Sequence, residues 1–177
     1  MPHRSSSGAS VYSRSMSIDP LQYRAVLGHF PTGVTVVTGI IEGEPVGFTV
    51  GSFTSVSIDP PLVGFLAMVD SDRWKLLRNA RSFCVNILAD DQDDLCWTFA
   101  KSSIEHPFEG VDWQPAPVTG APLIAGCAAW IDCSHGQIVD AGDHHFVMGQ
   151  VEALGSADGD VGALVFFKGK LGGYTAH

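Results

Sequence analysis

The sequence has 177 residues, of which 45% are hydrophobic and only 16% charged, and its formal net charge is −9 at pH 7. This length fits one domain with a sizeable core, and the acidic balance excludes the broad basic surface that nucleic-acid binding needs. No apolar run is long enough to span a membrane. Because charged residues are so few, we expect part of the surface to be covered by a second copy in a homodimer.

Residues 1–17 are rich in serine and contain no acidic residue. We expect a disordered N-terminal tail there, followed by one domain over residues 18–177. The four cysteines have no C-x-x-C spacing and lie mostly in apolar runs: Cys84, Cys96, Cys127 and Cys133. Buried, reduced thiols are the favoured interpretation, which is typical of a cytoplasmic protein.

The first predicted element is a helix that begins after Asp19 and ends before Pro31. Asp is a good N-cap, and Pro20 at the first helical position loses no hydrogen bond. Apolar residues then recur at helical spacing: Tyr23, Val26, Leu27 and Phe30. This spacing predicts one buried face that packs against a sheet.

Two strands and a turn follow this helix. Residues 34–38 are β-branched throughout, residues 42–44 have the composition of a turn, and residues 46–50 form the predicted return strand. The almost continuously apolar residues 62–69 predict a strand that is covered on both faces.

Short helices alternate with strands in the next part of the chain. Ser71 is a good cap for a helix through residue 78, and residues 83–88 read as a strand. Acidic residues 90–94 mark a further helix N-terminus, where the helix dipole favours negative charge. We expect Leu95 and Phe99 to face inward from that helix.

The last third of the chain is predicted to be a loop followed by strands. Residues 102–122 contain four prolines, and strands are expected at residues 128–134, 145–154 and 163–168. About six or seven strands with two or three short helices indicate a mainly β fold, an all-β barrel with helical decoration.

One stretch stands out chemically. Five of the nine residues 49–57 carry a hydroxyl group, and Gly47 and Gly51 flank its start. Glycine lets backbone N–H groups approach a ligand, and hydroxyls donate to phosphate oxygens without adding charge. An edge strand with a solvated hydroxyl face explains the same composition equally well.

The wider string resembles the flavin reductase-like family, the reductase components of two-component flavin-dependent monooxygenases. The matching pieces occur in the family's order: Gly-Phe-Thr-x-x-Ser-Phe-Thr-Ser-Val-Ser-x-Asp-Pro-Pro at residues 47–61, Phe30-Pro31-Thr32-Gly33-Val34 before it, and Phe83-Cys84-Val85-Asn86-Ile87-Leu88, Phe99-Ala100-Lys101 and Gly142-Asp143-His144 after it. This resemblance implies an FMN-binding split β-barrel of Greek-key type.

It also implies a function. The chain would be an NAD(P)H-dependent flavin reductase that transfers hydride to FMN or FAD and passes the reduced flavin to a separate monooxygenase. The flavin contacts implied by the resemblance are the side chains of Thr49, Ser52, Phe53, Thr54 and Ser55 and backbone groups of Val50 and Gly51. Lys101 would contact the phosphate, and His144 would lie beside the nicotinamide.

Alternatives remain open for several of these residues. Lys101 has the position of a simple helix C-terminal cation, and a lone histidine is more often structural than catalytic. His144 and His145 are adjacent, so a strand would point them to opposite faces, which argues against a metal site. For the whole chain, the alternatives are a split-barrel oxidoreductase that uses FMN or deazaflavin on a small organic substrate directly, and a flavin-binding module without turnover.

Overall fold

The computed structural model describes residues 18–175, and the predicted disordered tail at residues 1–17 lies outside them. Within the described range there are three helices: α1 (Pro20–Leu27), α2 (Asp72–Leu77) and α3 (Asp93–Ala100). The first strands are β1 (Thr32–Gly33), β2 (Thr35–Ile41), β3 (Glu44–Val50), β4 (Thr54–Ser57), β5 (Leu62–Met68) and β6 (Ser82–Ile87). The remaining ones are β7 (Trp113–Pro115), β8 (Pro122–Ile124), β9 (Ala129–Ala141), β10 (His144–Ser156), β11 (Ala163–Phe167) and β12 (Lys170–Tyr174).

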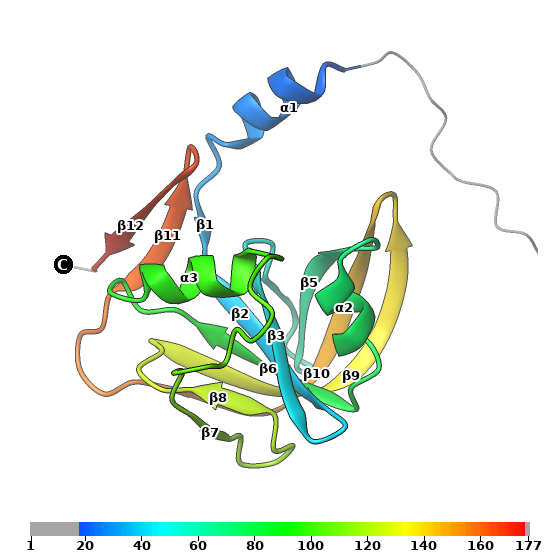
Figure 1. Cartoon of the computed structure of the whole chain (residues 1–177), viewed down its shortest axis with the longest axis vertical. Helices are drawn as coiled ribbons and strands as arrows, with labels where there is room; N and C mark the ends of the chain where they lie inside the picture. Colours follow the sequence, from blue (N-terminus) through cyan, green and yellow to red (C-terminus); the bar gives the residue numbers. More distant parts are fainter. Residues whose placement is uncertain (1–17, 176–177) are drawn as a thin grey trace, which may run out of the picture.

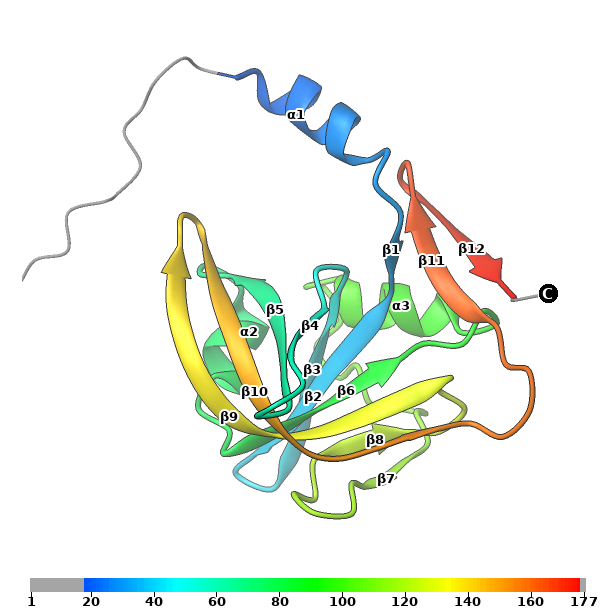
Figure 2. The same cartoon turned by 180° about the vertical axis from the view of Figure 1, so that it is seen from behind.

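A curved antiparallel sheet of seven strands forms the body of the molecule, in the order β3-β2-β6-β9-β10-β5-β4 (Figure 1). Its two edge strands, β3 and β4, are consecutive in the sequence and are joined by residues 51–53 alone. Four peptide steps span at most about 14 Å, so the sheet must curve until its edges approach each other. This is the expected mainly β split barrel, seen from behind in Figure 2.

Local turn chemistry explains the hairpin that begins this sheet. Glu42 and Gly43 connect β2 to β3, and both have positive φ angles, 53° and 88°. Two-residue turns with positive φ match the twist of antiparallel strands. The predicted strand, turn and return strand are therefore confirmed, with each strand extended by two or three residues at the turn.

The core lies between the sheet and α2. Phe48, Phe65, Trp74 and Phe83 form a chain of edge-to-face pairs whose ring centroids are 5.5–6.4 Å apart. Such pairs contribute about 0.5–1.5 kcal/mol each beyond the burial of their surface. A second buried cluster lies under α3 and includes Val36, Leu88, Phe99 and Leu164. The two helices are thus anchored to the same barrel at different places.

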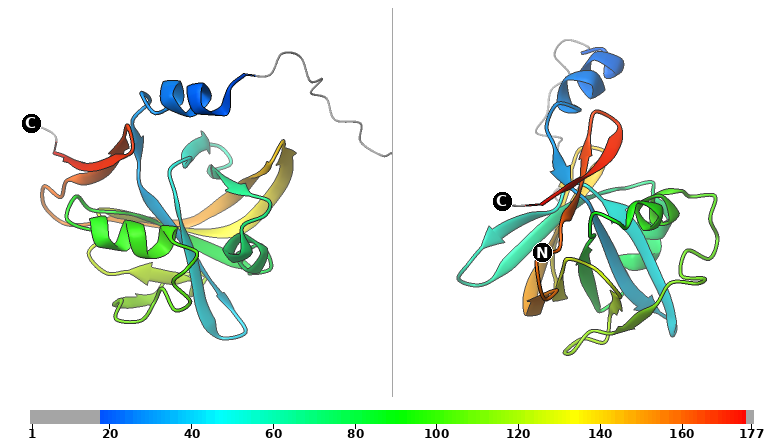
Figure 3. Two further views of the ribbon diagram at one scale, coloured as in Figure 1. Left: turned by 45° about the horizontal axis from the view of Figure 1, so that its top comes forward. Right: turned by 90° about the vertical axis from the view of Figure 1, so that its left-hand side faces the viewer.

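The prediction for the first helix was half right. Asp19 caps α1 by accepting a hydrogen bond from the backbone N–H of Leu21 at 3.1 Å, as expected. The predicted packing against a sheet is wrong, because no residue of α1 is buried, and Tyr23 and Phe30 are 55% and 74% exposed. Figure 3 shows α1 projecting from the barrel, so its apolar face has no partner within the described chain.

Two other expectations need correction. The apolar run at β5 is covered on one face only, since Leu66 and Met68 are exposed while the alternate residues Val63, Phe65 and Ala67 are buried. The number of strands was underestimated because β1, β4, β7, β8 and β12 have only two to five residues each, too few for a periodic pattern. None of the helices within residues 18–175 is long and apolar enough to cross a membrane.

Candidate functional site

A cavity of about 720 Å³ opens beside the connection between β3 and β4. Its wall includes the end of β3, the exposed end of β5, the start of α2, the end of α3 and the start of β10. Of the nine predicted site residues, five line it: Thr49, Val50, Gly51, Ser52 and His144. Residues more than 90 positions apart in the sequence thus meet at one cavity because β10 pairs with β5, placing His144 opposite Met68.

The connecting residues offer unused hydrogen-bond donors at the edge of this cavity. Gly51, Ser52 and Phe53 lie between the two strands, and their backbone N–H groups donate to no other group in the part of the chain that the structure describes. Backbone N–H groups that lack a partner in the protein must be satisfied by water or a ligand. This short segment is therefore suited to binding an acceptor-rich ligand.

The hydroxyl of Ser52 has a structural partner. It donates to the backbone oxygen of Leu66 at 3.1 Å and accepts from the backbone N–H of the same residue at 2.9 Å. Ser52 thereby ties the connection between β3 and β4 to β5 at the cavity wall. One lone pair and the backbone N–H of Ser52 remain for a ligand.

The other hydroxyl residues differ in their surroundings. Thr49 donates to the backbone oxygen of Cys96 at 2.7 Å, which ties β3 to α3. Phe53 packs against the buried core, while Thr54 and Ser55 lie exposed on β4 and do not line the cavity. The structure therefore brings only the first half of the predicted flavin-contact segment to the cavity.

Lys101 ends α3 and is exposed, and its neighbours Ala100 and Ser102 line the cavity while Lys101 itself does not. Its backbone oxygen accepts a hydrogen bond from Arg73 at 2.9 Å. Arg73 lines the cavity, and burial lowers its pKa. The sequence around Arg73 gives no sign that its side chain reaches the end of α3, so this contact was missed by the sequence analysis.

His144 begins β10 after a two-residue turn in which Gly142 has a φ of 71°. Its Nδ1 lies 2.7 Å from a carboxylate oxygen of Asp143, and this hydrogen bond, together with the charge of the imidazole, lowers the pKa of Asp143. Because an ionised carboxylate only accepts hydrogen bonds, Nδ1 carries the hydrogen. Nε2 is then the ring nitrogen of His144 that is left for a ligand.

His145 has a different environment, as the alternation along a strand predicted. Its Nδ1 accepts a hydrogen bond from the indole Nε1 of buried Trp74 at 2.8 Å, and its Nε2 lies 3.4 Å from Asp140. Trp74 also packs edge-to-face on its ring, with centroids 6.0 Å apart. His145 is thus a packing residue, and only His144 lines the cavity.

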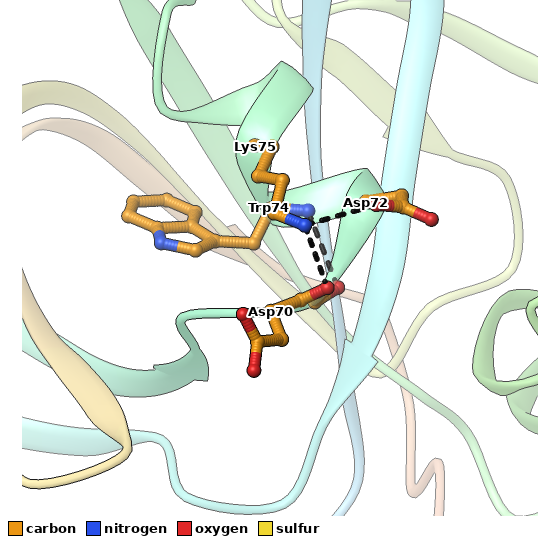
Figure 4. Close-up of polar contacts among 5 residues, drawn as sticks. Asp70, Asp72, Trp74 and Lys75 are labelled. Atoms are coloured by element: carbon orange, nitrogen blue, oxygen red, sulfur yellow. Dashed lines mark hydrogen bonds and ion pairs between the residues drawn. The ribbon is translucent and has the colours of Figure 1, made fainter.

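The start of α2 forms the acidic side of the cavity. Ser71 caps the helix by accepting from the backbone N–H of Trp74 at 3.3 Å, as predicted. Lys75 bridges the carboxylate of Asp72 and the backbone oxygen of Asp70, each at 3.1 Å, and Figure 4 shows the Trp74 indole pointing away from this cluster. This network fixes the helix end from which Arg73 projects.

Known proteins are similar to this chain in both sequence and fold. A flavin reductase of Pseudomonas putida is 44% identical over 161 residues, which cover 90% of this chain and 93% of that protein. The reductase subunit HsaB of a flavin-dependent monooxygenase from Rhodococcus jostii is 40% identical, covering 89% and 79%. The solved structure of an NADH:FAD oxidoreductase of Streptomyces globisporus in complex with NAD and FAD fragments superposes with a TM-score of 0.81 at 36% identity, covering 89% of this chain and 95% of that one.

The family comparison covers most of the chain. The protein-family model described as "Flavin reductase like domain" matches residues 27–175, and this range includes every residue that lines the cavity. The resemblance inferred from the hydroxyl-rich stretch is thereby confirmed, and the chain belongs to the flavin reductase-like domain family.

Proposed function

We propose that this chain is an NAD(P)H-dependent oxidoreductase that reduces free FMN or FAD and releases the reduced flavin to a separate monooxygenase component. One observation carries the proposal: the unpaired backbone N–H groups of Gly51 and Ser52 and the imidazole of His144 lie at the same cavity. The reaction is NAD(P)H plus flavin plus a proton, giving NAD(P)⁺ and dihydroflavin.

The residues present fit a flavin. Its pyrimidine edge and its phosphate are rich in acceptors, which suit the N–H groups of residues 51–53, and its ring system needs an open, largely apolar wall such as that of Val50 and Leu66. Bound flavin supplies the hydride acceptor itself, so the protein needs mainly to orient two rings. In this role Thr49, Val50, Gly51 and Ser52 bind the flavin.

His144 would orient the nicotinamide. Its Nδ1 is held by Asp143, so the direction of Nε2 is set before a ligand arrives. Lys101, Thr54 and Ser55 lie outside the cavity wall, and their ammonium and hydroxyl groups would contact the phosphate end of a flavin that extends beyond it. Phe53 also lies outside the wall, where its ring packs against the core, and would contact the flavin next to Ser52. Lys101 is the cation closest in sequence to the lining residues of α3.

The relatives support the choice of substrates and partner. HsaB is a reductase subunit of a flavin-dependent monooxygenase, and the Streptomyces globisporus protein is an NADH:FAD oxidoreductase. A relative from Agrobacterium fabrum, 38% identical, is an FMN reductase that uses NADH. We therefore place NADH first as the hydride donor for this chain and keep both flavins as substrates.

Two further properties belong to the proposal. The exposed apolar face of α1 and the apolar groove between Pro31 and the β11–β12 hairpin support a homodimer in which a second copy covers them. All four cysteines are buried and unpaired, which supports a reducing, cytoplasmic location.

The test is an anaerobic absorbance assay with purified protein, a large excess of FMN or FAD, and NADH or NADPH. The proposal predicts that the oxidised flavin band disappears at a rate proportional to protein concentration, over many turnovers. If flavin binds but stays oxidised with both nicotinamides, the chain is a binding module and the proposal is wrong.

A further inference from the structure

Arg73 joins three segments that the strand pairing leaves separate. Its Nη1 donates to the backbone oxygen of Phe99 at 2.8 Å and lies 3.5 Å from that of Gly47. Its Nη2 donates to the backbone oxygens of Lys101 at 2.9 Å and Ile104 at 2.6 Å. One guanidinium on α2 therefore contacts β3, the end of α3 and the segment that follows it.

Three of these oxygens lie at or beyond the end of α3: Phe99 is in its last turn, and Lys101 and Ile104 follow it. The last carbonyl groups of a helix have no partner in the next turn, and α3 has no basic residue in its own last turn. Lys101 leaves the helix in an extended conformation, with φ −82° and ψ 119°. The planar fork of an arginine satisfies several such oxygens at once, and its charge suits the negative end of the helix dipole.

Within residues 18–175, no carboxylate forms an ion pair with Arg73. The carboxylates that form ion pairs in this range are Asp72, Asp140 and Asp143. Four contacts with carbonyl oxygens occupy its two terminal nitrogens, so they are not available for a bidentate contact with phosphate. The role of the guanidinium is therefore to bind backbone carbonyl groups.

The segment that Arg73 binds forms one wall of the cavity. Ala100 and Ser102 line the cavity on either side of Lys101, and Arg73 lines it as well. The body of α3 has its own anchors, since Thr49 bonds to Cys96 and the Phe99 ring fills the space that a Cβ on Gly47 would need. Arg73 supplies the tie that continues past the helix to residue 104.

We propose that Arg73 is a positioning residue of the flavin cavity, which fixes the wall at Ala100 and Ser102, and with it Lys101, by clamping residues 99–104 to α2. The role deepens the proposed flavin reduction and rests on it. Without the clamp, residues 101–104 would sample open conformations, and part of the flavin binding energy would be spent on ordering them.

The test compares Arg73→Met and Arg73→Lys with wild type, and uses Arg78→Met as the matched control. Arg78 lies exposed at the end of the same helix and makes no side-chain hydrogen bond in the described chain. We expect Arg73→Met to raise the flavin KM about tenfold, equivalent to about 1.4 kcal/mol, while kcat changes less than threefold. Arg78→Met should leave both constants unchanged.

A second readout does not depend on activity. Trypsin cleaves after lysine, and the carbonyl group of Lys101 is held by the clamp, so native Arg73→Met should be cut after Lys101 at least tenfold faster than wild type. Arg73→Lys keeps the charge, but one ammonium group does not reproduce the fork. We expect it to behave like Arg73→Met in both assays, and it takes over the test if Arg73→Met does not fold.

A wild-type flavin KM in both Arg73 variants would overturn the proposal, and so would an unchanged rate of cleavage after Lys101. Wild-type behaviour of Arg73→Lys would also overturn it, because a positive charge without the guanidinium fork would then be enough to hold residues 99–104. Failure of the proposed function looks different. In that case wild type itself reduces no flavin, while the cleavage assay still reports whether the clamp exists.

Discussion

Replacing Asn86 by alanine is the sharpest test of how the sheet is held to the β7–β8 hairpin. Its side chain is completely buried on β6. The amide nitrogen lies within hydrogen-bond distance of the oxygens of Val36, Thr38 and Pro122 at 3.1–3.3 Å, and the amide oxygen accepts from the backbone N–H of Ile124 at 2.8 Å. One residue thus connects β2, β6 and β8.

The cost of Asn86→Ala follows from these contacts. The two hydrogen bonds that the amide N–H groups can donate cost about 1 kcal/mol each when lost, and the buried N–H of Ile124 left without a partner costs about 1–3 kcal/mol. The sum is roughly 3–5 kcal/mol, against a typical total stability of about 5–15 kcal/mol. For a chain of this size, the melting temperature should fall by roughly 6–20 °C.

Urea unfolding followed by tryptophan fluorescence measures this loss, at one fixed protein concentration because a dimer would make stability concentration-dependent. Asn79→Ala is the control, since Asn79 is exposed in the turn after α2 and its side chain bonds only to the backbone oxygen of Lys75. It should lose less than about 1 kcal/mol. A loss below 1 kcal/mol for Asn86→Ala would refute the idea that this network holds the hairpin.

Three more predictions concern single contacts. Ser52→Ala should lower the free energy of unfolding by about 1–2 kcal/mol, because both hydrogen bonds to the backbone of β5 disappear; an unchanged value in urea would contradict it. Burial raises the pKa of the Cys127 thiol to about 12, so about one thiol in 10,000 is ionised at pH 8. Ellman's reagent should therefore label it only after unfolding, and rapid labelling of native protein would exclude this burial. Gly149→Ala should cost about 1–3 kcal/mol, since a Cβ there overlaps the Phe83 ring, whereas Gly33→Ala meets no atom and should be neutral; equal effects would count against this packing.

Local patterns predicted local structure well. The Asp19 and Ser71 caps, the turn at Glu42 and Gly43 and the alternation of His144 and His145 each depend on neighbours in sequence, and each is present. The wrong expectations concern what an element packs against. The spacing in α1 predicted an apolar face correctly, but spacing carries no information on whether that face meets its own chain.

In the candidate site too, local sequence features were predicted and contacts between distant segments were not. Composition alone drew attention to residues 49–57, yet only the first part of this stretch lines the cavity. The partner of the Ser52 hydroxyl is on β5, and the partners of Arg73 are on β3 and α3. These contacts depend on strand pairing and helix placement, so no reading of the stretch by itself could find them.

The most direct test of the central claim blocks the cavity and measures flavin reduction. Ala100 is exposed at the cavity wall, so Ala100→Trp should fill the site without disturbing the core. Asp94→Trp, at the exposed opposite end of α3, is the control. In the anaerobic assay with excess FMN and NADH, we predict at least a tenfold slower reduction by Ala100→Trp and a wild-type rate for Asp94→Trp. Equal, wild-type rates for both variants would place flavin reduction elsewhere on the molecule.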